Sequence, residues 1–271
     1  MEGAPGRDGR SERVYGVADV TGDSPLQSTV LEDLSEAVRY RRWLAGLARP
    51  YLGEHPIEIG SGTGDYALEW ASGVPRLTAT EADKSRFDVI TERFAGHPVI
   101  QTRWLLLGDQ GGAGAPYGGS DGPNGDHSAA VAFNVLEHIP DHVGALRAMA
   151  DLVRPGGAVV LVVPAFPSAM SRFDLAIGHQ RRYTRASLGG ALEEAGLTVE
   201  RLRYVNPIGL LAWYVMVKGL DRTPRNGVAL RAYDRAVVPL ARALDRLPMP
   251  FGQSVFAVAR SAGRGRAAGL S

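Results

Sequence analysis

The feature that most constrains this chain is a short apolar segment that runs directly into a series of glycines. Residues Pro56 to Ile59 have the composition of a strand, and Gly60-Ser61-Gly62-Thr63-Gly64 follows without a break. Glycine has no Cβ and tolerates positive φ angles, so the backbone of such a turn can approach a ligand closely. Residues Tyr66 to Trp70 are compatible with a helix, whose first N–H groups would face the same ligand. We therefore predict a strand, a ligand-binding turn and a helix.

The spacing of the glycines narrows the class of ligand. They follow a G-x-G-x-G pattern, and Asp65 stands where the dinucleotide-binding fingerprint G-x-G-x-x-G has its third glycine. A nicotinamide-dependent dehydrogenase would need that glycine and a hydride-transfer motif such as Tyr-x-x-x-Lys, and neither is evident. The turn predicts a nucleoside ligand and does not favour a dehydrogenase.

Alternating strands and helices predict the fold. Further segments rich in Val, Ile, Leu and Ala follow the turn, and segments with helical periodicity separate them. Continuous apolar strands belong inside a parallel sheet that is covered on both faces. We expect a doubly wound α/β fold with a mostly parallel, seven-stranded sheet. The strands after the turn are expected at residues 77–80, 99–107, 126–135, 158–163, 199–204 and 254–259.

The chain divides into one domain and two flanking segments. Residues 1–27 are polar and rich in glycine, and we expect them to be disordered. The domain is expected at 28–260, with a first helix at 30–51 and a helical, substrate-side insertion at 207–251 before the last strand. A sharp turn is expected at 155–157, and residues 261–271 are expected to form a flexible tail.

Composition excludes several functions. The 271 residues contain no cysteine, which excludes disulfides, thiolate metal sites and cysteine nucleophiles. The net charge of +1 offers no general attraction for nucleic acid. The apolar segment 207–217 is shorter than the roughly 20 residues of a membrane-spanning helix, and the start lacks a signal peptide. We expect a cytoplasmic monomer or homodimer without stable membrane insertion or a nucleic-acid partner.

An acidic residue at the end of the second expected strand points to the same ligand. Glu81 follows Gly60 by 21 positions. A carboxylate at this place in a nucleoside-binding sheet accepts hydrogen bonds from the two hydroxyls of a ribose. An acid at a strand end can also simply face water, but the combination with the glycine turn favours the ribose contact.

Four segments of the chain together resemble a known family. EIGSGTGDY, TATEAD, AAVAFNVLEHIPD and LVRPGGAVVLVVPA are similar, in this order, to segments of the class I S-adenosylmethionine-dependent methyltransferases. The later FDLAIGHQRRYTRASL resembles a bacterial small-molecule subgroup with a GHxRRY loop. The resemblance covers about residues 30–204 and implies a Rossmann-like methyltransferase fold with S-adenosyl-L-methionine as cofactor.

The resemblance also implies roles for individual residues. The turn and Glu58 would hold the methionine end of the cofactor, and Glu81 would bind both ribose hydroxyls. Asp109 would accept from the adenine amino group, and Asn134 would lie near the methyl sulfonium. The implied cofactor-binding residues are Glu58, Gly60, Ser61, Gly62, Gly64, Glu81, Ala82, Asp83, Asp109, Asn134 and Val135.

Two histidines are candidates for a catalytic base. His138 follows the fourth expected strand, close to the implied methyl group, and His179 lies in the long loop after the fifth. A neutral imidazole can take a proton from a hydroxyl or ammonium group. His138 can equally be a packing residue, and Asp174 is a candidate to orient His179. We expect no metal site, because Pro140 makes a shared helical face for His138 and His142 improbable.

Four residues are candidates for binding the substrate. Arg181, Arg182 and Tyr183 could bind a carboxylate or phosphate through a guanidinium fork, or the arginines could form structural ion pairs with Glu193 or Glu194. Trp213 is a candidate for the wall of an apolar acceptor pocket, with core packing as the alternative.

The preferred interpretation is transfer of a methyl group to a small-molecule acceptor in specialised metabolism. We expect oxygen as the methylated atom, then nitrogen, then carbon. A non-catalytic nucleoside-binding protein with the same fold remains the alternative from a different class.

Overall fold

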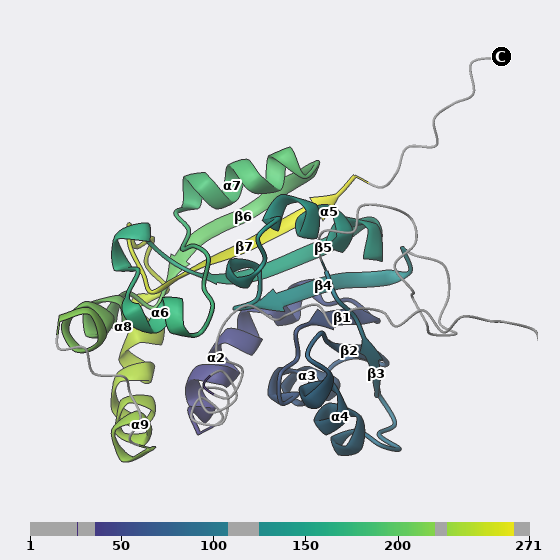
Figure 1. Ribbon diagram of the computed structural model, residues 1–271, viewed down its shortest axis with the longest axis horizontal. Coiled ribbons are helices and arrows are strands. Elements are labelled where there is room, and N and C mark those ends of the chain that lie inside the picture. The colour runs from purple at the N-terminus through teal and green to yellow at the C-terminus, as the bar shows by residue number, and fades with distance from the viewer. Residues whose placement is uncertain (1–25, 27–35, 108–124, 220–226, 263–271) are drawn as a thin grey trace, which may run out of the picture.

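One seven-stranded sheet forms the centre of the part of the chain that the structure describes (Figure 1). The structure is a computed structural model, which describes residue 26 and residues 36–107, 125–219 and 227–262. The strand order is β3-β2-β1-β4-β5-β7-β6, and β7 alone among these strands runs antiparallel to its neighbours. The predicted doubly wound, mostly parallel fold is therefore confirmed. The strands are β1 (Pro56–Ile59), β2 (Leu77–Glu81), β3 (Ile100–Trp104), β4 (His127–Phe133), β5 (Val153–Pro164), β6 (Leu197–Val205) and β7 (Ser254–Ser261).

Helices cover both faces of the sheet (Figure 1). On one face, Leu146 and Leu188 pack against the strands, and on the other Leu44 and Trp70 do so. Each buried leucine contributes roughly 1.5–3 kcal/mol of hydrophobic free energy relative to an exposed one. The helices are α2 (Val38–Ala48), α3 (Asp65–Ala71), α4 (Lys84–Arg93), α5 (His142–Leu152), α6 (Arg172–Ala176), α7 (Arg185–Glu194), α8 (Pro207–Ala212) and α9 (Gly227–Leu244), with short helical turns η1 (Arg49–Tyr51), η2 (Leu136–His138), η3 (Pro167–Ala169) and η4 (Trp213–Gly219).

The order of the strands decides where a ligand can lie. The chain adds β2 and β3 on one side of β1 and then returns to place β4 on the other side. Open α/β sheets bind their ligands beyond the carboxyl ends of the strands at this point of reversal. The glycine turn after β1 and the segment after β4 therefore meet at the expected binding position.

Two predicted strand boundaries are wrong by three residues or more. β3 ends at Trp104, three residues before the predicted end. β5 begins at Val153, so the turn predicted at 155–157 is an irregularity inside a strand. Gly156 has a φ of +76°, and the pairing of β4 with β5 shifts register between His127 and Ala129. Val153 pairs with His127 and Ala158 pairs with Ala129, so residues 154–157 bulge out between two paired positions of the same strand, which a local pattern cannot predict.

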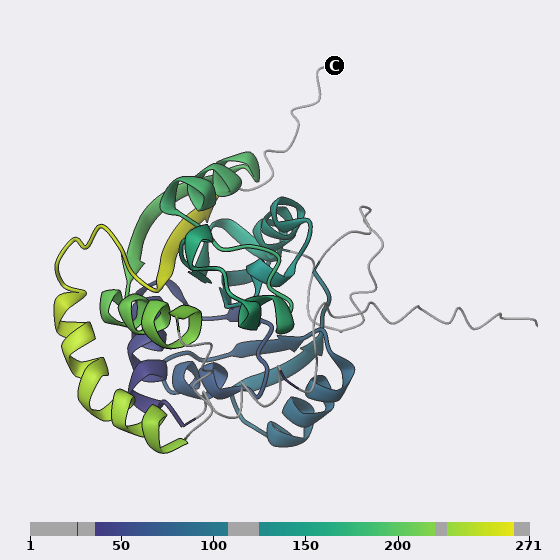
Figure 2. The ribbon, with the colours of Figure 1, turned by 60° about the vertical axis from the view of Figure 1, so that its left-hand side comes forward.

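The predicted helical insertion contains α8, the π-helical η4 and α9. α9 runs along the outer side of α2, as the two views show together (Figures 1 and 2). The Asp234 carboxylate of α9 accepts hydrogen bonds from the backbone N–H groups of Arg39, at 3.0 Å, and Tyr40, at 2.8 Å. Residue Ala37 at the start of α2 has no side-chain acceptor, so α9 supplies the cap that α2 itself lacks.

The flanking segments are only partly described. The predicted disorder of residues 1–27 lies outside the described residues, apart from residue 26, and so do residues 30–35 of the first helix predicted at 30–51. The later part of that helix is observed as α2 and η1. The boundary of the predicted tail at 261 is wrong, because Ser261 is the last residue of β7 and pairs with Leu197. No helix in the described ranges is long and apolar enough to cross a membrane.

Candidate functional site

The glycine turn has the backbone conformation that its sequence predicts. Gly60, Gly62 and Gly64 have φ angles of +68°, +56° and +82°. A Cβ at Gly60 would lie 2.7 Å from a methyl carbon of Val135, in the segment after β4. Because residues with a side chain rarely adopt this conformation and have no room here, the close approach of the two strand ends requires glycine. The turn and Val135 lie together, as the resemblance implies.

The side chain of Glu58 is buried beneath the glycine turn. Its side chain is 4% exposed, and the Ser61 hydroxyl donates a hydrogen bond of 2.9 Å to its Oε2. Burial raises the pKa of Glu58 to about 8, against the opposing effect of the Ser61 hydrogen bond. A positively charged group next to this carboxylate would favour its ionised form.

Glu81, the residue predicted to bind ribose, has a carboxylate held by three backbone groups. Its Oε2 accepts from the N–H of Gly62 at 2.9 Å, and its Oε1 accepts from the N–H groups of Ala82, at 2.9 Å, and Asp83, at 3.0 Å. These bonds fix the side chain at the carboxyl end of β2 and tie it to the glycine turn. Oε2 accepts only one of these bonds, so it keeps a lone pair that can accept from a ribose hydroxyl.

Two of the implied cofactor-binding residues, Ala82 and Asp83, have local roles as well. The Asp83 side chain accepts from the N–H of Arg86 at 3.0 Å and caps α4. The carbonyl of Ala82 accepts from the indole Nε1 of Trp104 at 2.8 Å. Trp104 is 54% exposed at the end of β3 and is not among the site residues predicted from the sequence. An aromatic residue at the carboxyl end of a strand was the available signal. Asp109 lies outside the described residues.

Beyond β4 the chain turns sharply toward the β1 turn. Asn134 has a φ of +54°, and its N–H donates to the carbonyl of Val162 at 2.8 Å. A residue other than glycine in this conformation costs free energy and is often found at a functional site. Asn134 and Val135 thus occupy the strand end at which the resemblance implies the methyl sulfonium.

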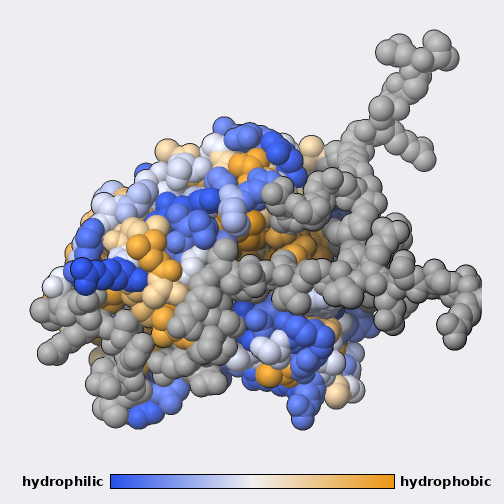
Figure 3. All heavy atoms as spheres, in the orientation of Figure 1, coloured by the Kyte–Doolittle hydropathy of each residue, from blue (hydrophilic) through white to orange (hydrophobic). Residues whose placement is uncertain are grey.

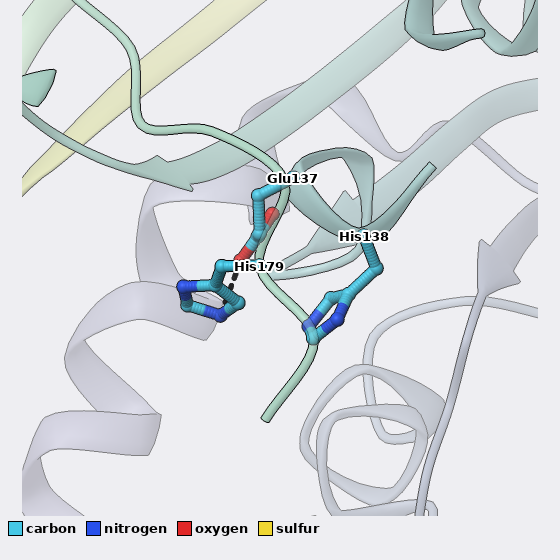
Figure 4. A group of neighbouring side chains, drawn as sticks. All are labelled: Glu137, His138 and His179. Atoms are coloured by element: carbon cyan, nitrogen blue, oxygen red, sulfur yellow. Dashed lines mark ion pairs between the residues drawn. The ribbon is translucent and has the colours of Figure 1, made fainter. Parts of the chain in front are cut away.

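Three side chains with metal-binding or proton-transfer chemistry meet just beyond this turn. Glu137 and His138 belong to η2, and His179 comes from the loop after β5, yet all three lie together (Figure 4). Oε1 of Glu137 is 3.7 Å from Nε2 of His179. The rings of His138 and His179 meet edge to face, with 4.7 Å between their centroids. The structure therefore brings the two candidate bases into one cluster.

The electrostatics of this cluster are governed by burial. The Glu137 side chain is fully buried, and neither of its oxygens accepts a hydrogen bond from the described residues. Burial raises the pKa of Glu137 to about 7, although His179 and Arg182 act in the opposite direction. Burial lowers the pKa of His138 to about 3, so its imidazole is neutral near pH 7. The cluster has an unusual buried carboxyl group next to a neutral imidazole.

Asp174 orients His179, as predicted. Oδ1 of Asp174 lies 2.7 Å from Nδ1 of His179. Burial acts to raise the pKa of Asp174, but the hydrogen bond to His179 and the charge of Arg182 outweigh it and lower the pKa to about 2. The carboxylate is therefore ionised and accepts, which places the proton of a neutral His179 on Nδ1 and leaves a lone pair on Nε2. That nitrogen faces Glu137.

The GHxRRY segment holds the loop in place. The N–H of Gln180 donates to the carbonyl of Glu137 at 2.8 Å. The guanidinium of Arg181 donates to the carbonyls of Ile139, at 2.9 Å, and Pro140, at 2.8 Å. These bonds attach the loop after β5 to the segment after β4. Contact of Arg181 with a substrate stays a prediction.

Arg182 and Tyr183 are buried, and they also help to hold the loop after β5 in place. Arg182 is 5% exposed, and its guanidinium donates to Oδ1 of Asp174 at 2.7 and 3.0 Å. The predicted ion pairs with Glu193 or Glu194 are wrong for this residue, because folding brings Asp174 closer. The hydroxyl of Tyr183 lies 3.1 Å from Nδ1 of His142. The guanidinium group of Arg182 and the hydroxyl group of Tyr183 thus form hydrogen bonds within the protein. These bonds would have to break before either group could contact a substrate.

Trp213 lies next to the same loop. Its indole Nε1 donates to the carbonyl of Ala169 at 2.9 Å, and the guanidinium carbon of Arg182 lies 4.5 Å from the centre of its ring. The side chain is half-buried. Its role as a wall of an acceptor pocket stays a prediction, and the observed contacts agree with the packing alternative.

The expectation of no metal site rests on one pair of histidines, and the structure brings together a different set of possible ligands. The pair considered in the sequence, His138 and His142, separates, since His142 bonds to Tyr183. Glu137, His138 and His179 instead each offer one ligand atom, and these atoms lie within 4.8 Å of one another. The third member is about forty positions away in the chain, so only the fold could reveal the set.

Two curated proteins that resemble this chain are named methyltransferases. An uncharacterised methyltransferase of Mycobacterium bovis is 31% identical over 112 residues, which are 41% of this chain and 51% of the relative. Glycine N-methyltransferase of Rattus norvegicus is 27% identical over 180 residues, which are 59% of this chain and 54% of the relative. The chain spans about half the length of the curated relatives it matches.

Solved structures share the fold. A putative methyltransferase from Haloferax volcanii, in complex with a methyltransferase activator, superimposes with a TM-score of 0.57 at 14% identity, covering 87% of this chain and 97% of that one. Geranyl diphosphate methyltransferase in complex with S-adenosylmethionine (SAM) gives a TM-score of 0.56 at 12% identity, covering 81% and 85%.

A family model described as "Methyltransferase domain" matches residues 32–202, the part that contains β1 to β5, the glycine turn, Glu81 and the histidine cluster. This match extends over more than half of the chain. The chain belongs to the methyltransferase-domain family.

Proposed function

We propose that this protein transfers a methyl group from S-adenosyl-L-methionine to a small-molecule acceptor. The observation that carries the proposal is the Glu81 carboxylate, which three backbone N–H groups hold at the end of β2 and tie to the glycine turn. A buried acceptor of this kind suits a ribose diol. The bound cofactor would supply a methyl group on a sulfonium, which is a good leaving group.

The residues of the chain would bind and align this cofactor. Glu58 would face the ammonium of its methionine end, and the positive φ angles of the turn let the backbone approach the carboxylate. The absence of a side chain at Gly60 keeps the ends of β1 and β4 close. Asn134 and Val135 would border the methyl group. Alignment and exclusion of water are the main contributions that such a displacement needs from a protein.

The acceptor would enter from the side of the loop after β5. Apolar side chains are exposed on α6, α8 and η4, among them Leu175 at 63%, Leu211 at 58% and Val215 at 60%. Figure 3 shows apolar residues on the face where α6 and α8 lie. A small, partly apolar acceptor fits this surface. Oxygen is the preferred methylated atom, and nitrogen or carbon are alternatives, as the relative named glycine N-methyltransferase illustrates for nitrogen.

Proton removal from an acceptor hydroxyl is the predicted role of His179, with His138 as the second candidate. Nε2 of His179 is the nitrogen without the proton, because Nδ1 faces Asp174. A cytoplasmic location, a role in specialised metabolism and a monomeric or dimeric state remain part of the proposal.

Calorimetric titration with S-adenosylhomocysteine tests the cofactor site. We expect Glu81→Ala to weaken binding by at least 10-fold, because the ribose hydroxyls lose a charged acceptor worth about 1.5–3 kcal/mol. Glu54→Ala is the control, since this exposed glutamate pairs with Arg154 before the amino end of β1. Equal affinity of wild type and Glu81→Ala would reject the ribose contact. Binding without transfer to any acceptor would support the non-catalytic alternative.

A further inference from the structure

We propose that Glu137, His138 and His179 bind a divalent metal ion of the zinc type. The ligand atoms that these residues offer lie within 4.8 Å of one another. They come from η2 and from the loop after β5, and their side chains meet beside the carboxyl end of β4 (Figure 4). Binding of the ion does not depend on the proposed function, although its use there does.

Glu137 is a buried carboxyl group whose side-chain oxygens lack hydrogen-bond partners among the described residues. Its side chain is fully buried, and neither oxygen accepts a hydrogen bond from the described residues. Its Oε1 lies 3.7 Å from Nε2 of His179, which is beyond hydrogen-bond distance. A buried carboxyl group without a partner is costly, and a metal ion is one of the few partners that satisfies it. The carboxylate therefore has free coordination capacity.

His179 is arranged as a metal-binding histidine usually is. Its Nδ1 lies 2.7 Å from the Asp174 carboxylate, which Arg182 and Ser171 hold in turn. A carboxylate that accepts from one imidazole nitrogen orients the ring and makes the other nitrogen a better ligand. The other nitrogen, Nε2, is the one that faces Glu137. The outer partners of a metal ligand are thus already in place.

The set of donors indicates the class of metal. Two imidazoles and one carboxylate suit zinc and neighbouring first-row ions, whereas calcium and magnesium prefer oxygen ligands. Zinc ligands lie about 2.0–2.2 Å from the ion. The donors lie within 4.8 Å of one another, so binding of the ion would draw them closer together. Three protein ligands leave a further position open, as in catalytic zinc sites.

The open position gives the ion a use in the proposed reaction. An acceptor hydroxyl that binds there loses its proton to water more readily, because the ion lowers its pKa. Its oxygen then forms a bond to the methyl carbon while the bond between that carbon and the cofactor sulfur breaks. With the ion bound, Nε2 of His179 is a ligand, so the base assigned to His179 is not needed.

Zinc binding by the full chain tests the proposal. Protein freed of metal with a chelator is titrated with zinc chloride in competition with a chromophoric chelator, and the zinc content after dialysis is measured by mass spectrometry. We expect one zinc ion per chain. Asp174→Asn removes a residue that only orients a ligand, and it should weaken zinc binding by about 10- to 100-fold. Glu137→Gln and His179→Gln remove ligands themselves and should weaken zinc binding by more than that. His142→Gln is the matched control, because its imidazole bonds to Tyr183.

Two results would overturn the proposal. One is equal zinc affinity of wild type and His179→Gln, and the other is a loss in His142→Gln as large as in Glu137→Gln. Binding of cobalt to the wild-type protein gives a second test. The bound ion should show the intense visible absorption of four- or five-coordinate cobalt. The weak spectrum of the hydrated ion would also overturn the proposal. Binding of S-adenosylhomocysteine to the same metal-free sample separates the two proposals, since either ligand can bind while the other fails.

Discussion

The Asp174 carboxylate and the His179 imidazole are hydrogen-bonded over 2.7 Å, with Asp174 at the start of α6 and His179 just after its end. The same carboxylate oxygen accepts from Arg182, and the other oxygen accepts from the N–H and hydroxyl of Ser171. One buried acid therefore caps α6, neutralises an arginine and orients a histidine of the candidate site. The shape of this loop and the chemistry of the cluster depend on each other.

Removing this acid should destabilise the protein strongly. Asp174→Ala leaves Arg182 buried with an uncompensated charge, and breaking a buried pair in this way costs about 3–5 kcal/mol. Urea denaturation followed by circular dichroism measures the loss. Lys84→Ala removes an exposed pair with Asp88 and should cost less than about 1 kcal/mol. A similar small loss for Asp174→Ala would show that Arg182 finds another partner.

Gly60→Ala should impair both folding and cofactor binding. The new Cβ would have a φ of +68° and lie 2.7 Å from Val135. The conformation alone costs roughly 1–2 kcal/mol, and the contact forces β1 and β4 apart. Gly190→Ala is the control, because this glycine of α7 has open space around it and alanine favours a helix by about 1 kcal/mol. Thermal unfolding and titration with S-adenosylhomocysteine should give opposite stability changes for the two variants.

Binding of S-adenosylhomocysteine should release a proton near pH 7. Burial raises the pKa of Glu58 to about 8, so most of the protein carries a protonated Glu58 at that pH. The ammonium of the ligand favours the ionised form, so affinity should rise as the pH increases toward about 8. Calorimetry in buffers of different ionisation enthalpy measures the released proton. Glu58→Gln should abolish the release, and an unchanged release in this variant would assign it to another group.

The stability of the protein should fall in mild acid because of His127. Burial and the neighbouring His55, whose ring centre is 4.3 Å away, lower the pKa of His127 from 6.5 to about 4. His127 binds a proton near pH 6.5 in the unfolded chain and only near pH 4 in the folded chain. The contribution of neutral His127 to the free energy of unfolding is therefore complete above pH 6.5 and is lost as the pH falls to about 4. His127→Gln should show a shallower fall in melting temperature over this interval. Measurements of both proteins at pH 8 provide the reference, and parallel curves would contradict the assignment.

Much of the fold could be predicted because it depends on local patterns. The segment from Pro56 to Gly64 contains its own strand and turn signals, and the observed φ angles agree with them. Asp141 and Thr184 cap α5 and α7 through hydrogen bonds from backbone N–H groups three residues later, which are also local contacts. The start of β5 could not be predicted in this way, because Val153 belongs to the strand only through its pairing with His127, across a bulge that contains Gly156.

The candidate site was predictable to a smaller extent. Glu81 and the glycines were found because strand ends of a parallel sheet meet at one edge. The partner of Arg182 was not, since Asp174 is buried against it only after the loop has folded. Trp104 was missed because it is an exposed residue in a weakly apolar strand, and its contact with Ala82 joins two strands.

By itself, the sequence determined the α/β alternation, the glycine turn, the acid at the end of β2 and the family to which these belong. All of these are encoded in neighbouring residues, where chain geometry leaves few choices. The tertiary structure alone decided that Glu137 and His179 share one buried cluster, that Arg182 pairs with Asp174 and that Asp234 caps α2. These contacts depend on how loops and helices pack, and packing brings together residues whose spacing in the chain carries no signal.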